Sequence, residues 1–66
     1  MSVILRNIRI KCAQRHITLA ELERKTKIGN GVIARWEKGN PRVDLLKKVA
    51  DFFNVTIDEL MKEDSA

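Results

Sequence analysis

The sequence predicts an all-α fold, a compact five-helix bundle, and three observations predict it. Apolar residues recur at helical spacings of three and four along most of the chain, and the alternation typical of strands is almost absent. Two Thr-x-x-Glu patterns, at Thr18 and Thr56, have the form of capping boxes that begin helices. The chain has 66 residues, which suffices for one domain with one modest core.

The first two helices are predicted from apolar spacing and from the first capping box. A helix over about 3–15 is indicated because apolar side chains recur there every four residues. A second helix over about 19–26 follows from Thr18 and Glu21, since hydroxyl and carboxylate at this spacing can each accept the other residue's amide. The recurring residues of the first helix are Ile4, Ile8 and Cys12.

Glycine, proline and threonine residues mark the limits of the remaining helices. Gly29 is an acceptable N-cap for a third helix over about 30–38, and Gly39 suits a left-handed C-cap that the following proline reinforces. A fourth helix is expected over about 42–53, and a short fifth helix opens at Thr56. The apolar residues that define the third and fourth helices are Val32, Ile33, Trp36, Val43, Leu46, Val49, Ala50 and Phe53.

Composition excludes several classes of protein. The one cysteine cannot build a disulfide framework, and no Cys/His cluster has the spacing of zinc ligands, so we expect neither a metal nor another cofactor. Arg6 and Arg9 interrupt the N-terminal apolar residues, which argues against a signal peptide. No segment approaches the roughly 18 apolar residues of a membrane span. These features together predict a cytoplasmic protein.

Charge is distributed unevenly along the chain, whose net charge is +4. Residues 1–48 carry twelve Lys/Arg against four Asp/Glu, a balance of +8, and residues 49–66 carry one against five, a balance of −4. A basic body with an acidic C-terminal part suits a polyanion on one face, although a solvated basic surface would have the same composition.

Three stretches, in this order, carry a resemblance to a known family. They are ITLAELE at 17–23, IGNGVIARWEKG at 28–39 and LKKVADFFNVTIDEL at 46–60. Together they resemble the lambda-repressor and Cro class of helix-turn-helix proteins, most closely the prophage-repressor-like regulators of Gram-positive bacteria. The resemblance covers about residues 4–62 and implies a helix-turn-helix in the second and third helices, with double-stranded DNA as partner.

The sequence departs from the pattern of many relatives at two positions. Leu19 stands where many have a glutamine that reaches a phosphate, and Cys12 stands where many have an arginine that pairs with the counterpart of Glu37. One phosphate contact and one structural ion pair of the family are therefore in doubt here. Both departures also occur in the prophage-like subset.

Four residues are candidates for contact with bases if the start of the third helix enters the major groove, as the resemblance implies. Asn30 and Gly31 match its first two positions, and Arg35 is placed about one turn further on the same face, with Ala34 nearby. An Asn amide can pair with adenine and an Arg fork with guanine, while Gly31 and Ala34 leave room for close approach or a thymine methyl. Asn-Gly is also a common turn pair, and Arg35 can be a plain surface cation.

Phosphate contacts, which fix the register of such a helix, are expected from residues around it. Thr18 lies at the positive N-terminal end of the second helix, although capping is its stronger role. The loop after the third helix matches the stretch that relatives press against the DNA backbone. The predicted phosphate-binding residues are Thr18, Lys27, Lys38, Asn40, Arg42 and Arg9.

Other chemically distinctive residues have simpler explanations. Trp36 could stack on a base, but its spacing from Val32 and Ile33 places it at the edge of the core. Cys12 and His16 are four apart on one helix, yet no further Cys or His completes a metal site or a catalytic pair. Cys12 is therefore assigned to the core and His16 to a helix end, and we predict no enzymatic activity.

The function that these inferences favour is a sequence-specific DNA-binding transcriptional regulator, a repressor that acts by occupying an operator. Residues 1–62 form the predicted domain and 63–66 a frayed tail. We expect a homodimer, at least on DNA, with an apolar dimer surface on the fifth helix that can equally be core. The residues of this surface are Ile57, Leu60 and Met61. An antitoxin-like or partner-binding regulatory module with the same fold is the alternative.

Overall fold

The computed structural model describes residues 3–38 and 41–62, and every regular element within those ranges is helical. The elements are α1 (Val3–Gln14), α2 (Leu19–Thr26), the 3₁₀ helix η1 (Ala34–Glu37), α3 (Val43–Phe53) and α4 (Ile57–Met61). The all-α class is confirmed. The predicted count of five helices holds only if η1 is included, because the third predicted helix is a series of turns followed by one short 3₁₀ segment.

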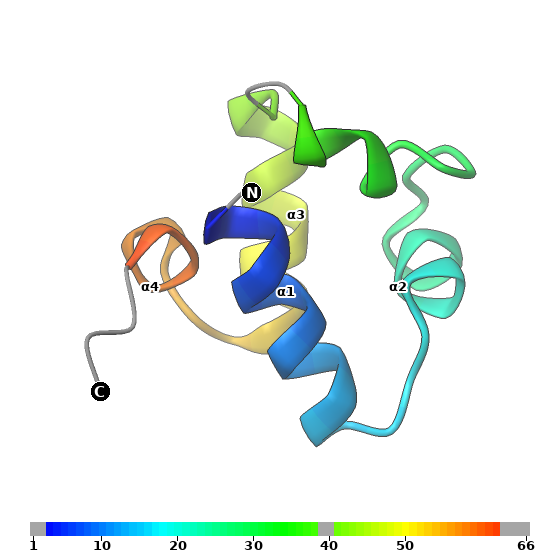
Figure 1. The fold of residues 1–66 in the computed structure, drawn as a ribbon, viewed down its shortest axis with the longest axis horizontal. Coiled ribbons are helices and arrows are strands. Elements are labelled where there is room, and N and C mark those ends of the chain that lie inside the picture. The colour runs from blue at the N-terminus through cyan, green and yellow to red at the C-terminus, as the bar shows by residue number, and fades with distance from the viewer. Residues whose placement is uncertain (1–2, 39–40, 63–66) are drawn as a thin grey trace.

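The helices are arranged around α1, which lies in the middle of Figure 1 with α2 on one side and α4 on the other. α3 passes behind α1, and η1 lies across the top between α2 and α3 (Figure 1). Direct contacts join α1 to α2, η1 and α4, and join α3 to α2 and α4. The two elements of the predicted helix-turn-helix, α2 and the segment that ends in η1, thus lie at one side of the domain, away from α4.

Each helix contributes buried side chains to one hydrophobic core. Trp36 is only 6% exposed, which confirms its assignment to the core or core edge, and Cys12 is buried as predicted. Val43 belongs to the apolar pattern of its helix but is 70% exposed, because it is the first residue of α3. The buried apolar residues are Leu5, Ile8, Cys12, Leu22, Ile28, Ile33, Trp36, Leu46, Val49, Ala50, Phe53 and Leu60.

Local hydrogen bonds define several helix ends as the sequence predicted. The capping box that begins α2 is complete: the Glu21 amide donates to Thr18 Oγ1 at 3.1 Å, and the Thr18 amide donates to Glu21 Oε1 at 3.1 Å. Thr56 Oγ1 likewise accepts the Glu59 amide at 3.1 Å at the start of α4. Asn54 ends α3 in the left-handed conformation, with φ of 59°.

Two other helix ends are held by side chains from far along the chain. Asn7 Nδ2 donates to the carbonyl oxygens of Leu60 at 2.7 Å and Lys62 at 2.8 Å, and so ties the end of α4 to α1. The last turn of α3 carries no basic residue of its own. Arg15 serves that end instead, since its guanidinium donates to the carbonyls of the last two residues of α3 and lies 5.1–5.4 Å from both their ring centroids.

The third predicted helix, 30–38, is the main correction to the sequence-based fold. Gly31 has a φ of 82°, which takes the backbone out of the α region, and regular 3₁₀ structure begins only at Ala34. The N-cap position is held by Ile33 rather than Gly29, whose carbonyl instead accepts the Val32 amide at 3.1 Å in a turn. The predicted C-cap Gly39 and the tail 63–66 lie outside the described residues.

Candidate functional site

The segment between α2 and α3 has one buried side and one exposed side. Ile33 is completely buried, and Ile28 and Trp36 are 5% and 6% exposed, so three apolar side chains fix the segment to the domain. The side chains of Asn30, Ala34 and Arg35 are exposed. All three of these exposed residues are predicted base-contacting residues, and none of them is needed to fill the core.

Asn30 lies next to α2. It shares a shallow hollow of about 250 Å³ with Ala20, Glu23, Arg24 and Ile28. A group that approaches Asn30 therefore also meets the exposed side of α2.

Gly31 is the fourth predicted base-contacting residue, and it is partly buried. A β-carbon built at Gly31 has no atom of the described residues within 4 Å, so only the backbone conformation demands glycine there. The space beside Gly31 is open to a ligand.

The relative placement of these residues differs from the expected one. The sequence predicts Asn30 and Gly31 in the first turn of an α-helix and Arg35 one turn later on the same face. Asn30 and Gly31 instead lie in turns that precede η1, and Arg35 lies within η1. Helical periodicity therefore does not relate Asn30 to Arg35, although both are exposed.

Exposed cations surround this segment. Arg9 on α1, Lys27 at the end of α2 and Lys38 at the end of η1 all have exposed side chains. Lys27 has a φ of 61°, a left-handed conformation that disfavours residues other than glycine, asparagine and aspartate. A lysine that occupies this position beside the exposed turn places a cation there despite the conformational cost.

The remaining predicted phosphate-binding residues have local partners or are not described. Arg42 pairs with Asp44, with Nε 3.3 Å from Oδ1, and both side chains are exposed. The Thr18 hydroxyl accepts the amide of its capping box, so capping occupies at least one of its lone pairs. Asn40 lies outside the described residues.

One residue of the site was missed by sequence reasoning. Glu23 on α2 is 4% exposed, and its carboxylate accepts the backbone amides of Gly31 and Ile33, each at 2.9 Å. These partners lie eight and ten residues further along the chain. No helical spacing rule connects such positions, and Glu23 looked like one more surface acid of α2.

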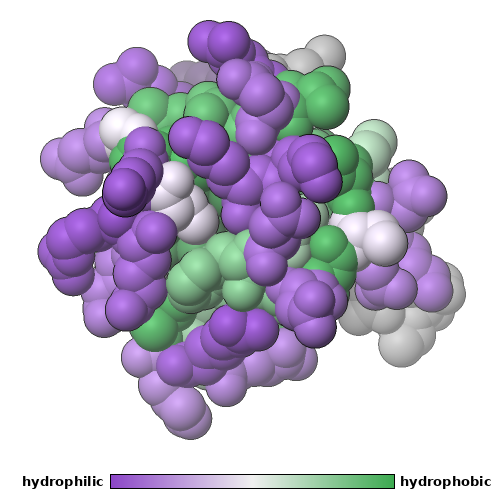
Figure 2. Space-filling view, turned by 180° about the vertical axis from the view of Figure 1, so that it is seen from behind, coloured by the Kyte–Doolittle hydropathy of each residue, from purple (hydrophilic) through white to green (hydrophobic). Residues whose placement is uncertain are grey.

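The proposed dimer surface is also altered by the structure. Leu60 is completely buried, so the core is confirmed for it over the dimer surface that was the other alternative. Ile57 is partly buried, and Met61 is 52% exposed. In the back view of Figure 2, hydrophilic side chains cover much of the surface and leave hydrophobic areas between them.

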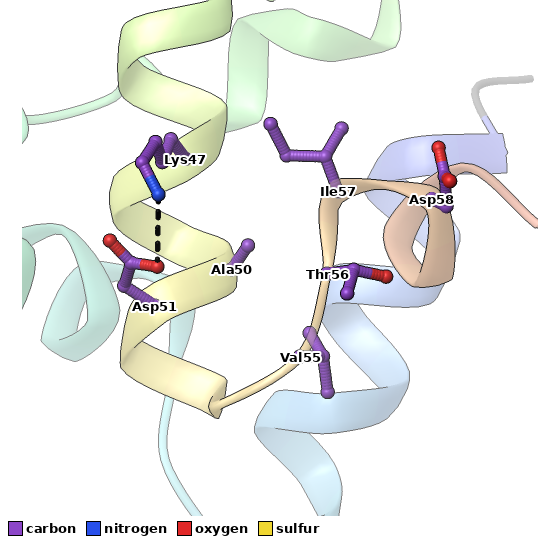
Figure 3. Close-up of a pocket in the computed structure, with 7 residues that line it drawn as sticks. All are labelled: Lys47, Ala50, Asp51, Val55, Thr56, Ile57 and Asp58. Atoms are coloured by element: carbon purple, nitrogen blue, oxygen red, sulfur yellow. Dashed lines mark ion pairs between the residues drawn. The ribbon is translucent and has the colours of Figure 1, made fainter.

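A groove of about 370 Å³ runs between α3 and the start of α4 (Figure 3). Lys47, Ala50 and Asp51 of α3 form one wall, and an ion pair of 3.6 Å joins Lys47 to Asp51. The other wall is the stretch 55–58. None of the residues that line this groove belongs to the segment that follows α2.

Two features are absent from residues 3–38 and 41–62. These residues contain no group of three or more His, Cys, Asp or Glu side chains that could hold a metal ion. Their helices are all too short or too polar to cross a membrane.

A short helix followed by a turn and a second, outward-facing helical segment defines the class of helix-turn-helix proteins. The chain belongs to the helix-turn-helix family of the lambda-repressor and Cro type, whose profile matches residues 5–60. The resemblance seen in the sequence is thereby confirmed. Regulation of transcription through DNA binding is the activity characteristic of this family.

The chain is also similar to a curated protein, the HTH-type transcriptional activator BcrR of Enterococcus faecalis. The two are 37% identical over 49 residues, which cover 71% of this chain and 24% of BcrR. The chain thus spans about a quarter of the length of that relative. No solved structure matches the chain.

Proposed function

We propose that this domain binds double-stranded DNA in a sequence-specific manner and represses transcription by occupying an operator. One observation carries the proposal: the segment after α2 is fixed by buried Ile28, Ile33 and Trp36, while its polar side chains face outward. A fixed backbone with exposed hydrogen-bonding side chains is what selection among base pairs requires, because a mobile segment would adapt to any sequence.

Base contacts are proposed for the exposed residues of this segment. The Asn30 amide can donate to adenine N7 and accept from adenine N6, and the Arg35 guanidinium can donate twice to guanine. Ala34 offers a methyl group to a thymine methyl. Gly31, which has open space beside it, lets a base edge or sugar approach the backbone.

Phosphate contacts are proposed for the cations around the segment. Arg9, Lys27 and Lys38 are exposed, and Arg42 becomes available if its exposed ion pair with Asp44 yields to a phosphate. Exposed ion pairs of this kind are weak, so the exchange costs about 1 kcal/mol or less. Thr18 and Asn40 complete the proposed set.

We further propose that the domain binds as a homodimer, at least on DNA. One copy offers about three to five phosphate contacts and a single segment for base contacts, which is little for specific binding. Two copies related by a two-fold axis would contact half-sites about one helical turn apart. Exposed Met61 and partly buried Ile57 are the remaining apolar candidates for the dimer surface.

Selection of bound duplexes from a random pool tests these proposals together. A palindromic consensus is the expected result, and failure to enrich any sequence would contradict sequence-specific binding. Asn30→Ala and Arg35→Ala should each lose discrimination at one base position, by about 1–3 kcal/mol, with the fold unchanged. Lys38→Glu should instead weaken binding to all sequences alike. A sequence-dependent effect of Lys38→Glu would contradict its assignment to the DNA backbone.

A further inference from the structure

Glu23 is the buried charged residue among those that the structure describes, and it faces the segment proposed to contact bases. Its side chain reaches from α2 across the turn, where Oε1 accepts the Gly31 amide and Oε2 accepts the Ile33 amide, each at 2.9 Å. The residue is 4% exposed. A carboxylate buried to this extent is tolerated only where hydrogen bonds replace water, and here each oxygen has such a bond.

The two amides belong to the turn that leads into η1. They precede the first residue of η1, so they form the positive end of this helical segment. Glu23 therefore acts on η1 as an N-cap residue acts on a helix, except that it belongs to α2. The amides of Gly31 and Ile33 are already occupied within the protein, and a DNA phosphate cannot use them without displacing the carboxylate.

The bond to Gly31 acts on residues 29–31, which have no buried side chain and lie between buried Ile28 and buried Ile33. Ile33 and Trp36 hold the later residues through their buried side chains. Earlier in the segment, Gly29 and Asn30 are exposed and follow buried Ile28. The Val32 amide donates to the Gly29 carbonyl, and Glu23 accepts the Gly31 amide, so these two hydrogen bonds hold the turn that carries Asn30. Asn30 and Glu23 also line the same hollow.

We propose that Glu23 is a positioning residue for base selection: its carboxylate fixes the turn that carries Asn30 and Gly31 and does not itself touch DNA. This inference rests on the proposed function. Loss of the two bonds frees the turn while Ile33 and Trp36 keep the rest of the segment in place. Discrimination between sequences therefore falls, whereas attraction to DNA in general does not.

The test compares Glu23→Gln with a matched control on the same helix. A Gln side chain keeps the size of Glu23 but has one oxygen, so its amide nitrogen would face one of the two backbone N–H groups. Glu21→Gln removes the same charge from α2 and keeps an oxygen for its capping bond. Binding is measured for the duplex selected by the wild type and for a scrambled duplex at one salt concentration, well below the unfolding temperature of each variant.

The expected result for Glu23→Gln is at least a tenfold fall in the ratio of the two affinities. Affinity for the scrambled duplex should stay the same or rise, as in Glu21→Gln, because each variant loses a negative charge. An unchanged ratio in Glu23→Gln, or an equal fall in Glu21→Gln, would overturn the positioning role and leave the proposed function standing. A wild type that selects no sequence would overturn both.

A second measurement uses the wild-type protein and does not depend on the folding of a variant. Hydrogen exchange of the Gly31 and Ile33 amides is followed by NMR with and without the selected duplex. We expect both amides to be protected in the free protein and to show no additional protection specific to them in the complex. Amides that exchange freely until DNA is added would show that a phosphate, and not Glu23, is their partner.

Discussion

The turn at Gly31 makes a quantitative prediction that the structure defines well. Its φ of 82° favours glycine, and a β-carbon there would meet no atom of the described residues within 4 Å. Replacement by alanine therefore tests the cost of the positive φ without a clash between the new methyl group and other parts of the domain. An L-residue in this region costs about 1–2 kcal/mol. Removing a glycine from the unfolded chain returns about 0.4–1 kcal/mol, so Gly31→Ala should destabilise the domain by about 1 kcal/mol.

Urea unfolding followed by circular dichroism measures this difference. A domain of 66 residues is expected to have about 3–10 kcal/mol of stability, so a loss of about 1 kcal/mol shifts the midpoint clearly and lowers Tm by about 4–8 °C. Gly31→Asn should lose less, because asparagine tolerates positive φ better than alanine does. Gly29→Ala is the control without a positive φ, where the new β-carbon meets only a Val32 methyl at 3.2 Å. Equal midpoints for the wild type and Gly31→Ala would refute the positive φ.

Three further predictions concern other parts of the domain. Asp44→Asn should raise affinity for all duplexes about two- to fivefold at low salt, because it releases Arg42 from its ion pair. Asp51→Asn, at the other end of the same helix, is the control and should not raise affinity. Equal effects of the two variants in binding titrations would argue against the Arg42 contact. Asn7→Ala should lower the free energy of unfolding, measured in urea, by about 1–2 kcal/mol. Asn7→Asp should lower it more, because the carboxylate would face the carbonyl oxygens of Leu60 and Lys62. An Asn7→Asp variant as stable as the wild type would contradict this role of Asn7. Burial raises the pKa of the Cys12 thiol above its ordinary value of 9.0, against a smaller opposing effect of a nearby arginine. Its contribution to stability should therefore be complete below about pH 9 and lost as the pH rises through the higher folded-state pKa, and the thermal stability of Cys12→Ala should lack this part of the pH dependence.

The sequence was a good guide wherever local rules decide the structure. The capping box at Thr18 predicted the start of the second helix, and the spacing of Trp36 predicted its burial. These inferences succeeded because the interacting groups lie within one or two helical turns of each other. The prediction of an α-helix over 30–38 failed because groups that lie further apart in the sequence interact there. The backbone leaves the α region at Gly31, and the Gly31 and Ile33 amides are bound by Glu23, whose position in space no spacing rule gives.

The same limit applies to the ends of the last two helices. Asn7 and Arg15 each donate to carbonyl groups 37 or more residues further along the chain, and neither residue stood out in the sequence. Asn30, Ala34 and Arg35 are exposed and Gly31 is partly buried, but the relation of these candidates to one another was not predicted correctly. The positive φ at Gly31 interrupts helical periodicity between them, and composition does not predict that angle.

The separation between buried and exposed residues in the segment after α2 has an evolutionary consequence. Asn30, Ala34 and Arg35 contribute no buried side chain, and the backbone that carries them is held by other residues. New amino acids at these three positions should therefore cost the domain little stability. A library randomised at positions 30, 34 and 35 should consist mostly of folded proteins, and selection from it could yield domains with new target sequences. Descendants of one ancestral gene could diverge in target preference by the same route, without compensating changes in the core.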